Sequence, residues 1–414
     1  MSLALAPPPA PCLPGLSRRE AFVLELGAAL HRAGAPAHRL ETALSRISTQ
    51  LGLQAAFFST PTSLTAAFGD LGGQRSGLVR VTPGDVQLER LVLLDATGDA
   101  LLSGELDLDQ AEAQVAAIEA APPRFGPRVT TAATGLVSAS AVGFFAGTWG
   151  DVVLAGLVGL AVGLLQLASI RVAALGRLFL PVAAATATAL ASLGAWLLPG
   201  SSAQLITLCA LIVMVPGLSL TVAANELATG HLVSGTARMT GAAVVFLQIG
   251  LGVVAGSLVG GLLPPSPMPT VALPLPAGSL WVAGVLAAMS LVVLFQARPR
   301  DTPIILLAAL VALAATTTAS HWVAAPGPAF VGALAVGLLG NTSARISGRP
   351  AQVAVLPGIL LLVPGSVGFE AVSAMLQDEV LVAVQTAFAA LMAAVALAAG
   401  LLVANAALPA RKSL

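Results

Sequence analysis

The sequence has few charged residues, few aromatic residues and almost no cysteine. Of its 414 residues, 9% are charged, 4% are aromatic and none is tyrosine, whereas 57% are hydrophobic. Soluble domains carry about 25% charged residues, so this composition predicts an integral membrane protein. The two cysteines, Cys12 and Cys209, form neither a disulfide framework nor a metal-ligand spacing, and we expect no metal and no cofactor.

Several function classes lack the residues that they need. The net charge is zero and no basic patch with interleaved aromatics is present, which argues against a nucleic-acid partner. An alternative of another class, a membrane-anchored enzyme with a catalytic N-terminal domain, has no Ser/His/Asp set, zinc-ligand spacing or phosphate loop to support it. The partners expected are the lipid bilayer and a small polar solute, and a homo-oligomer is left open.

The charged residues are concentrated near the N-terminus. Residues 1–128 hold 13 of the 19 acidic and 10 of the 19 basic residues, which predicts a soluble domain ahead of a membrane domain. Residues 1–16 are rich in proline and lack a basic n-region, so we expect a disordered tail and not a signal peptide. Residues 17–121 should form a cytoplasmic α+β domain that ends before Pro122-Pro123.

Capping and periodicity signals place the elements of this domain. Ser17 and Glu20 have the spacing of a capping box, and apolar residues follow at helical spacing. Gly34-Ala35-Pro36 should separate this helix from a second one that ends at Gly52. The other expected elements are strands over 55–59, 64–68 and 78–82, and helices over 85–94 and from 107 or 109 to 120.

A polar cluster lies at the start of the second helix. It consists of Gly34, His38, Arg39 and Glu41. These residues could bind a polar ligand or contact the membrane domain. They could equally be a solvated helix face with one local ion pair, and the sequence leaves both interpretations open.

Apolar segments after residue 128 are long enough to cross a bilayer, which takes about 20 helical residues. Gly252, Gly256 and Gly260 repeat every fourth residue in one of them and should let two helices approach closely. His231 and Arg238 fall at the cytoplasmic end of the same segment, and no chemistry is assigned to them. The ten expected spans are 129–149, 152–170, 177–198, 203–222, 234–262, 279–297, 302–319, 327–342, 351–369 and 380–408.

The positive-inside rule orients these spans. With the N-terminal domain in the cytoplasm, the basic residues near or beyond the ends of the spans fall on the cytoplasmic side. They are Arg124, Arg128, Arg171, Arg177, Arg238, Arg298, Arg300, Arg345, Arg349, Arg411 and Lys412. Both termini are then cytoplasmic, and the expected location is the cytoplasmic membrane.

The tripeptide Val-Pro-Gly occurs at 215–217 and again at 363–365, deep inside apolar runs. Proline removes a backbone donor and clashes with the preceding turn, so each tripeptide should break a helix. The proline-rich linker 264–278 separates five spans in 129–263 from five in 279–408, and each break falls in the fourth span. An odd number of spans per half predicts two inverted repeats, as in many secondary transporters. Two unrelated prolines are the alternative.

Small polar residues lie at and beyond both breaks, where free backbone groups could hold a zwitterion. Glu226 or Glu370 could carry a coupling proton or oppose an ammonium group, and each could instead be a solvated helix end. The candidate transport residues are Pro216, Gly217, Ser219, Thr221, Asn225 and Glu226 in the first half, and Pro364, Gly365, Ser366 and Glu370 in the second.

Several stretches resemble the threonine/serine exporter family. They are Gly27 to Gly34, His38-Arg39-Leu40-Glu41, Leu51-Gly52-Leu53, Ser59-Thr60-Pro61-Thr62, Leu106 to Ile118 with Pro122-Pro123, Val215 to Leu227, and Leu362 to Ser366. This chain departs from the family at His38, where relatives often have a tyrosine or another aromatic residue.

The resemblance implies a cytoplasmic N-terminal domain, ten membrane helices in two halves, and export of threonine and serine driven by the proton gradient. Some relatives carry the halves on separate chains and are linked to dicarboxylate export. A dicarboxylate exporter of the same architecture is therefore the alternative, although it should place more cationic side chains near the breaks than this sequence has.

Overall fold

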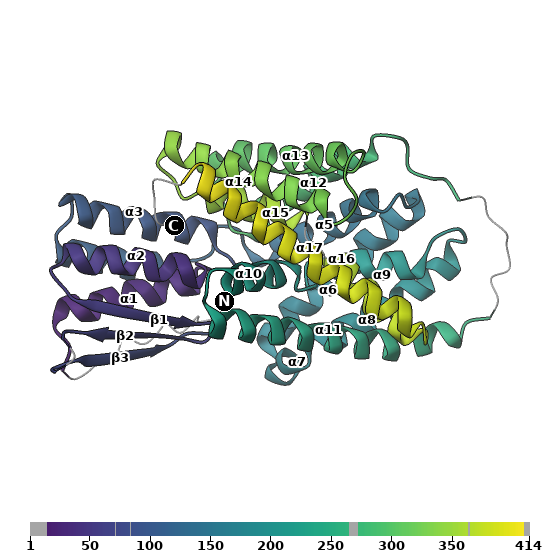
Figure 1. Cartoon of the computed structure of the whole chain (residues 1–414). Coiled ribbons are helices and arrows are strands. Elements are labelled where there is room, and N and C mark those ends of the chain that lie inside the picture. Colours follow the sequence, from purple (N-terminus) through teal and green to yellow (C-terminus); the bar gives the residue numbers. More distant parts are fainter. Residues whose placement is uncertain (1–14, 71, 83, 265–271, 363–364, 410–414) are drawn as a thin grey trace.

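The computed structural model describes residues 15–409 except 71, 83, 265–271 and 363–364. A bundle of helices forms most of the described chain, and a smaller unit with a three-stranded sheet lies at one end of it (Figure 1). The expectation of a helical membrane protein with a small N-terminal sheet is confirmed at this level.

The N-terminal unit packs helices on one face of an antiparallel sheet of order β1-β2-β3. Helices α1 and α2 contact the sheet, and α3 and α4 pack against these helices. The hydrophobic core of this unit contains buried side chains such as Phe22, Leu44 and Leu64. The elements are α1 (Arg18–Arg32), α2 (Ala37–Gln50), β1 (Ala55–Thr60), β2 (Ser63–Phe68), β3 (Arg75–Arg80), α3 (Leu88–Ser103) and α4 (Leu108–Ala120).

Local capping signals predicted the first helix start of this unit correctly. Ser17 and Glu20 bond reciprocally as a capping box. The expected helix over 85–94 instead begins at Leu88, because the backbone N–H groups of Leu88 and Glu89 donate to carbonyl oxygens of the bundle. The third strand begins at Arg75, earlier than the expected 78.

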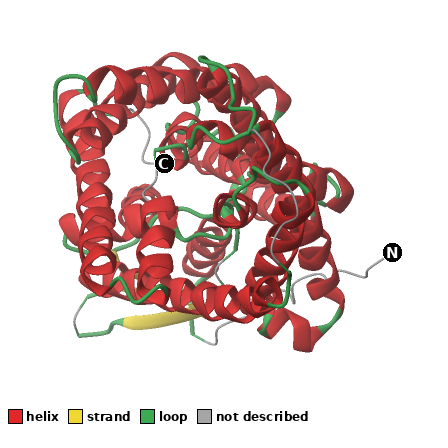
Figure 2. Cartoon of the chain, turned by 90° about the vertical axis from the view of Figure 1, so that its right-hand side faces the viewer, coloured by secondary structure: helices red, strands yellow, loops and turns green. Residues whose placement is uncertain are grey.

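The bundle contains the remaining helices. Its first half has α5 (Pro127–Ala141), η1 (Val142–Phe144), α6 (Trp149–Arg171), α7 (Ala173–Arg177), α8 (Phe179–Leu197), α9 (Ala203–Leu211), α10 (Gly217–Ala228) and α11 (Leu232–Gly261). Its second half has α12 (Ser279–Leu294), η2 (Pro299–Asp301), α13 (Thr302–Ala319), α14 (Gly327–Ser347), α15 (Gln352–Leu360), α16 (Gly365–Leu376) and α17 (Val380–Ala407). Figure 2 shows this bundle from the end away from the sheet.

Among the described residues, seven segments are long and apolar enough to cross a membrane. They are α6, α8, α11, Pro299–Ala319, α14, Gln352–Leu376 and α17. The other expected spans are shorter or interrupted. The span 129–149 ends its regular helix at Ala141, and the chain then turns through Ala146 at φ +49°. The span 203–222 is divided between α9 and α10, and 279–297 holds the 16-residue α12.

The helix break expected at 215–217 is present. Helix α9 ends at Leu211, Pro216 is the N-cap of α10, and Gly217 is its first residue. In the second half, α15 ends at Leu360 and α16 begins at Gly365. Val363 and Pro364 themselves lie outside the described residues.

The two halves of the bundle repeat the same helix contacts. In the first half α5 packs on α6, α8 packs on α6, α9 and α11, and α10 packs on α11. In the second half α12 packs on α13, α14 packs on α13, α15 and α17, and α16 packs on α17. The broken helices also have matching lengths: α9 and α15 have 9 residues each, and α10 and α16 have 12 each.

Small residues set the distance between α8 and α11. A Cβ atom added at Gly256 would lie 2.5 Å from the carbonyl oxygen of Ala185, and one added at Gly252 would lie 2.3 Å from that of Pro181. The close helix contact predicted from the glycine spacing is therefore confirmed.

Candidate functional site

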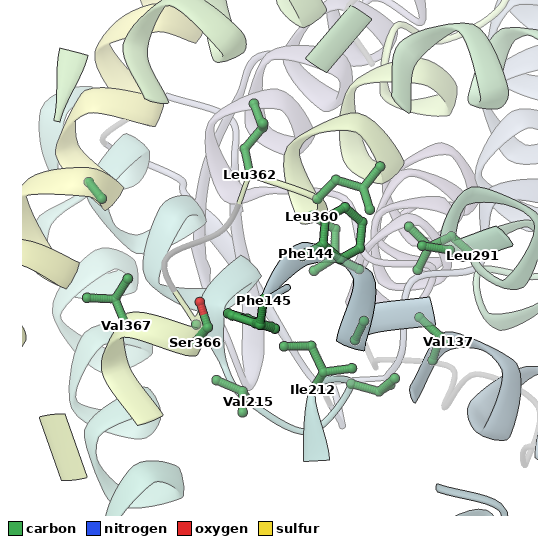
Figure 3. Close-up of a pocket in the computed structure, with 16 residues that line it drawn as sticks. Val137, Phe144, Phe145, Ile212, Val215, Leu291, Leu360, Leu362, Ser366 and Val367 are labelled. Carbon is green, nitrogen blue, oxygen red and sulfur yellow. The ribbon is translucent and has the colours of Figure 1, made fainter. Parts of the chain in front are cut away.

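The two broken helices meet at one cavity of about 320 Å³ (Figure 3). Val213 and Val215 line it from the first break, and Leu361 and Gly365 line it from the second. Its walls are mostly apolar, and Figure 3 shows Ser366 with its hydroxyl among valine, leucine and phenylalanine side chains. We call this space the break cavity.

A second cavity of about 480 Å³ continues the first toward the N-terminal unit. The two cavities share the lining residues Val213, Val215, Leu291 and Leu360. We call the second space the junction cavity, because the N-terminal unit borders it with His31, Gly34, Ala35, Pro36, Pro61, Gly84, Asp85 and Val86.

Gly34 is required at this border by its backbone. Its φ is +97°, and an added Cβ atom would lie 3.1 Å from Cγ2 of Val86. A side chain at this position would therefore be strained and crowded. The candidate Gly34 thus shapes the wall of the junction cavity.

Polar side chains are more numerous in the junction cavity than in the break cavity. They are His31, Asp85, Thr130, Thr134, Gln166, Ser219 and Arg238. Of these, only Ser219 was a candidate from the sequence. The hydroxyls of α5 were missed because this helix has no break, although Thr130, Thr134 and Ser138 recur every four residues and so form one polar face.

Glu226 is fully buried and is held by three groups. Its carboxylate accepts hydrogen bonds from Nε of Arg238 at 3.0 Å, from the Ser234 hydroxyl at 2.8 Å and from the Ala37 backbone N–H at 3.2 Å. The interpretation of Glu226 as a solvated helix end is therefore wrong. The carboxylate joins α10 to α11 and to the start of α2, and it stabilises the contact between the N-terminal unit and the bundle.

Two residues without an assigned role belong to this junction. Arg238 pairs with Glu226 and lines the junction cavity. Nε2 of His231 lies 3.5 Å from a carboxylate oxygen of Glu41, whose other oxygen accepts from the Ser59 backbone N–H. The sequence could not reveal these partners, because 12 residues separate Glu226 from Arg238 and 18 separate Glu41 from Ser59.

His38 and Arg39 face the bundle and do not form a local ion pair with Glu41. They line a third, smaller cavity together with the candidates Thr221 and Asn225. Nε2 of His38 lies 3.5 Å from Nδ2 of Asn225. Contact with the membrane domain, which the sequence left open for this cluster, is what the structure shows.

Burial sets the charge of the histidines in the N-terminal unit. Burial lowers the pKa of His38 to about 3, and the neighbouring positive charge of Arg39 acts in the same direction. Burial also lowers the pKa of His31, although the carbonyl oxygen of Thr60 lies 2.7 Å from its Nε2. Both rings are therefore neutral near pH 7. Burial raises the pKa of Glu41, and the Ser59 hydrogen bond opposes this shift.

The remaining candidates are Gly217, Pro216, Glu370 and Pro364. Gly217 is buried at the start of α10, and Pro216 lines the junction cavity. Glu370 lies on α16 with an exposed side chain. Pro364 lies outside the described residues.

Comparison with known families covers both halves of the chain. Residues 21–259 match a family model described as "Putative threonine/serine exporter", and residues 276–407 match one described as "Threonine/Serine exporter, ThrE". No solved structure gives a significant match.

Fungal proteins are similar to about 85% of the chain. Pheromone-regulated membrane protein 10 of Debaryomyces hansenii is 28% identical over 368 residues, which cover 84% of this chain and 36% of the relative. An uncharacterized protein of Schizosaccharomyces pombe is 26% identical over 365 residues, which cover 85% of this chain and 48% of the relative. The chain thus spans half or less of the length of these relatives. On the family matches, which together extend from residue 21 to residue 407, the chain belongs to the threonine/serine exporter family.

Proposed function

We propose that this protein is a secondary transporter that exports threonine, serine and similar small polar amino acids across the cytoplasmic membrane, driven by the proton gradient. The observation that carries the proposal is the meeting of two broken helices at one cavity. Broken helices leave backbone amides and carbonyls free to bind a substrate at the centre of the bundle. Membership of an exporter family supports the same activity.

The proposed architecture is ten membrane spans in two inverted five-helix repeats, 129–263 and 279–408, after a cytoplasmic domain over 17–121. The matching helix contacts of the halves and the equal lengths of their broken helices support it. Helix α5, helix α12 and the broken pair α9–α10 would complete the seven longer spans. Residues 1–16 are a tail and 264–278 a linker in this scheme.

The junction cavity offers charges of both signs for a zwitterion. Arg238 lines one part of it and the exposed Asp85 lines another. A substrate carboxylate would lie toward Arg238 and an ammonium toward Asp85, while Thr134 and Ser219 hydroxyls would bond the substrate hydroxyl. The break cavity, with Ser366 and apolar walls, is the next position along the path.

We assign the coupling proton to Glu370. Its side chain is exposed on α16 beyond the second break, and it makes no ion pair within the described part of the chain. Glu226 is less suited, because its buried carboxylate is already bonded to Arg238, Ser234 and the Ala37 N–H. Glu370→Gln should abolish uphill export and preserve exchange, whereas Glu379→Gln at the N-cap of α17 should preserve both. Uphill export that persists in Glu370→Gln rejects the assignment.

Peptide feeding tests the proposed substrate. Cells that lack the protein should accumulate intracellular threonine when they are given threonine-containing dipeptides, and expression of the protein should restore efflux. Equal efflux with and without the protein would contradict the proposal.

A further inference from the structure

A third cavity, of about 50 Å³, lies where the start of α2 meets the bundle. Its walls come from the N-terminal unit and from α10, α14, α15 and α17. It adjoins the junction cavity, with which it shares Pro36, Leu218, Val222 and Leu356. The polar side chains that line it are His38, Arg39, Thr221, Asn225, Gln352 and Asn405.

Three of these side chains have a buried polar atom without a hydrogen-bond partner among the described residues, and one of these atoms is Nδ1 of His38. Gln352 is only 2% exposed, and neither its Oε1 nor its Nε2 makes a hydrogen bond. The Oδ1 of Asn225, which is 9% exposed, is also unpaired. Buried amide groups in folded proteins are almost always hydrogen-bonded. Nε2 of Gln352 is a donor that could bind an anion, whereas the two amide oxygens are acceptors and could not.

The electrostatics of the cavity favour a negative partner. No carboxylate lines it, and Arg39 forms no ion pair within the described part of the chain. The first turns of two helices also meet here, because Arg39 is the third residue of α2 and Gln352 is the first of α15. Helix N-termini carry free N–H groups and a positive partial charge, although at α2 the Ala37 N–H already donates to Glu226. His38 is a neutral ring near pH 7, so the charged side chain among the lining residues is Arg39.

We propose that this cavity binds one small carboxylate anion between Arg39 and Gln352. The guanidinium of Arg39 supplies a planar pair of donors that matches a carboxylate, and Nε2 of Gln352 supplies another donor. The volume of about 50 Å³ suits an acetate-sized group and not a long acid or a nucleotide. The bound anion would tie α2 to α15, so the proposal concerns the contact between the N-terminal unit and the bundle and does not depend on transport.

Thermal unfolding of the purified full chain tests this site. At constant ionic strength, sodium acetate should raise the melting temperature with saturation, and sodium chloride should not. Arg39→Gln should raise the half-saturating acetate concentration at least tenfold. Arg46→Gln, which removes the same charge from the exposed face of α2, should leave it unchanged. An equal response to chloride and acetate, or no response to acetate, overturns the proposal.

A second variant keeps the test valid if Arg39→Gln does not fold. Gln352→Glu places a carboxylate in the cavity from the protein itself. The variant should melt at or above the wild-type temperature without acetate and should no longer respond to acetate. A lower melting temperature together with an unchanged acetate response contradicts the proposed site.

Discussion

Removal of the Glu226 charge tests how the N-terminal unit is held on the bundle. In Glu226→Gln, the amide oxygen can still accept from the Ala37 N–H, but the charge opposite Arg238 is lost. Breaking a buried ion pair by removing one partner costs about 3–5 kcal/mol. The Arg238 side chain is 23% exposed and Glu226 is 0% exposed. Because water reaches the arginine, we expect a smaller loss, about 2–3 kcal/mol.

Hydrogen exchange at the start of α2 is a suitable assay for this loss. Each 1.4 kcal/mol corresponds to about a factor of ten, so amides in the first turn of α2 should exchange about 30- to 150-fold faster in Glu226→Gln. Glu105→Gln, at an exposed position after α3, should leave their exchange unchanged.

A double-mutant cycle identifies the cause of the change. If Arg238 is the partner, Glu226→Gln with Arg238→Gln should recover at least about 1 kcal/mol relative to the sum of the single losses, because no charge is then left unpaired. An exchange rate in the first turn of α2 that rises less than threefold in Glu226→Gln would refute the reasoning. Free-energy losses of the two single variants that simply add in the double variant would refute it as well.

The other predictions concern the break cavity, acid stability and helix packing. Ser366→Leu should fill the break cavity and reduce the transport rate at least tenfold with an unchanged melting temperature. Ser257→Leu, on the exposed face of α11, should preserve the transport rate. Equal transport rates for the two variants in a flux assay would contradict this prediction. His38 has a native pKa of about 3 against about 6.5 when unfolded. The unfolded chain therefore binds more protons than the native chain between about pH 6.5 and pH 3. His38 protonation leaves the free energy of unfolding unchanged above about pH 6.5 and lowers it toward pH 3, by at most about 1.4 kcal/mol per pH unit. His38→Asn should flatten this part of the melting profile, and an identical slope disproves the role. Gly256→Ala should destabilise by about 1–3 kcal/mol, because its Cβ meets the α8 backbone, and Gly261→Ala, with open space around it, should be neutral in thermal unfolding.

Local signals in the sequence predicted much of the fold. The Ser17–Glu20 capping box and the break at Pro216 each depend on a few neighbouring residues, and both are present. The distribution of charged and apolar residues along the chain also predicted the division between the N-terminal unit and the bundle. Boundaries moved where a distant contact decided them, as at Leu88, whose N–H bonds to Phe295 of the bundle.

The candidate site was predicted less completely, because its groups come from distant parts of the chain. Asn225 and His38 are 187 positions apart, and so their contact has no local signal. Arg238 looked like a loop charge at a membrane boundary, but it pairs with a fully buried carboxylate. A carboxylate near a helix end can be solvated or paired, and only tertiary packing distinguishes the two.

Counterflow in proteoliposomes tests the central claim of amino-acid transport most directly. Vesicles that contain the purified full chain and are loaded with unlabelled serine should take up labelled threonine above its equilibrium level. Vesicles loaded with succinate should not take up labelled succinate in this way. Threonine uptake no greater than in protein-free vesicles would contradict the account, and succinate counterflow in its place would identify a dicarboxylate exporter.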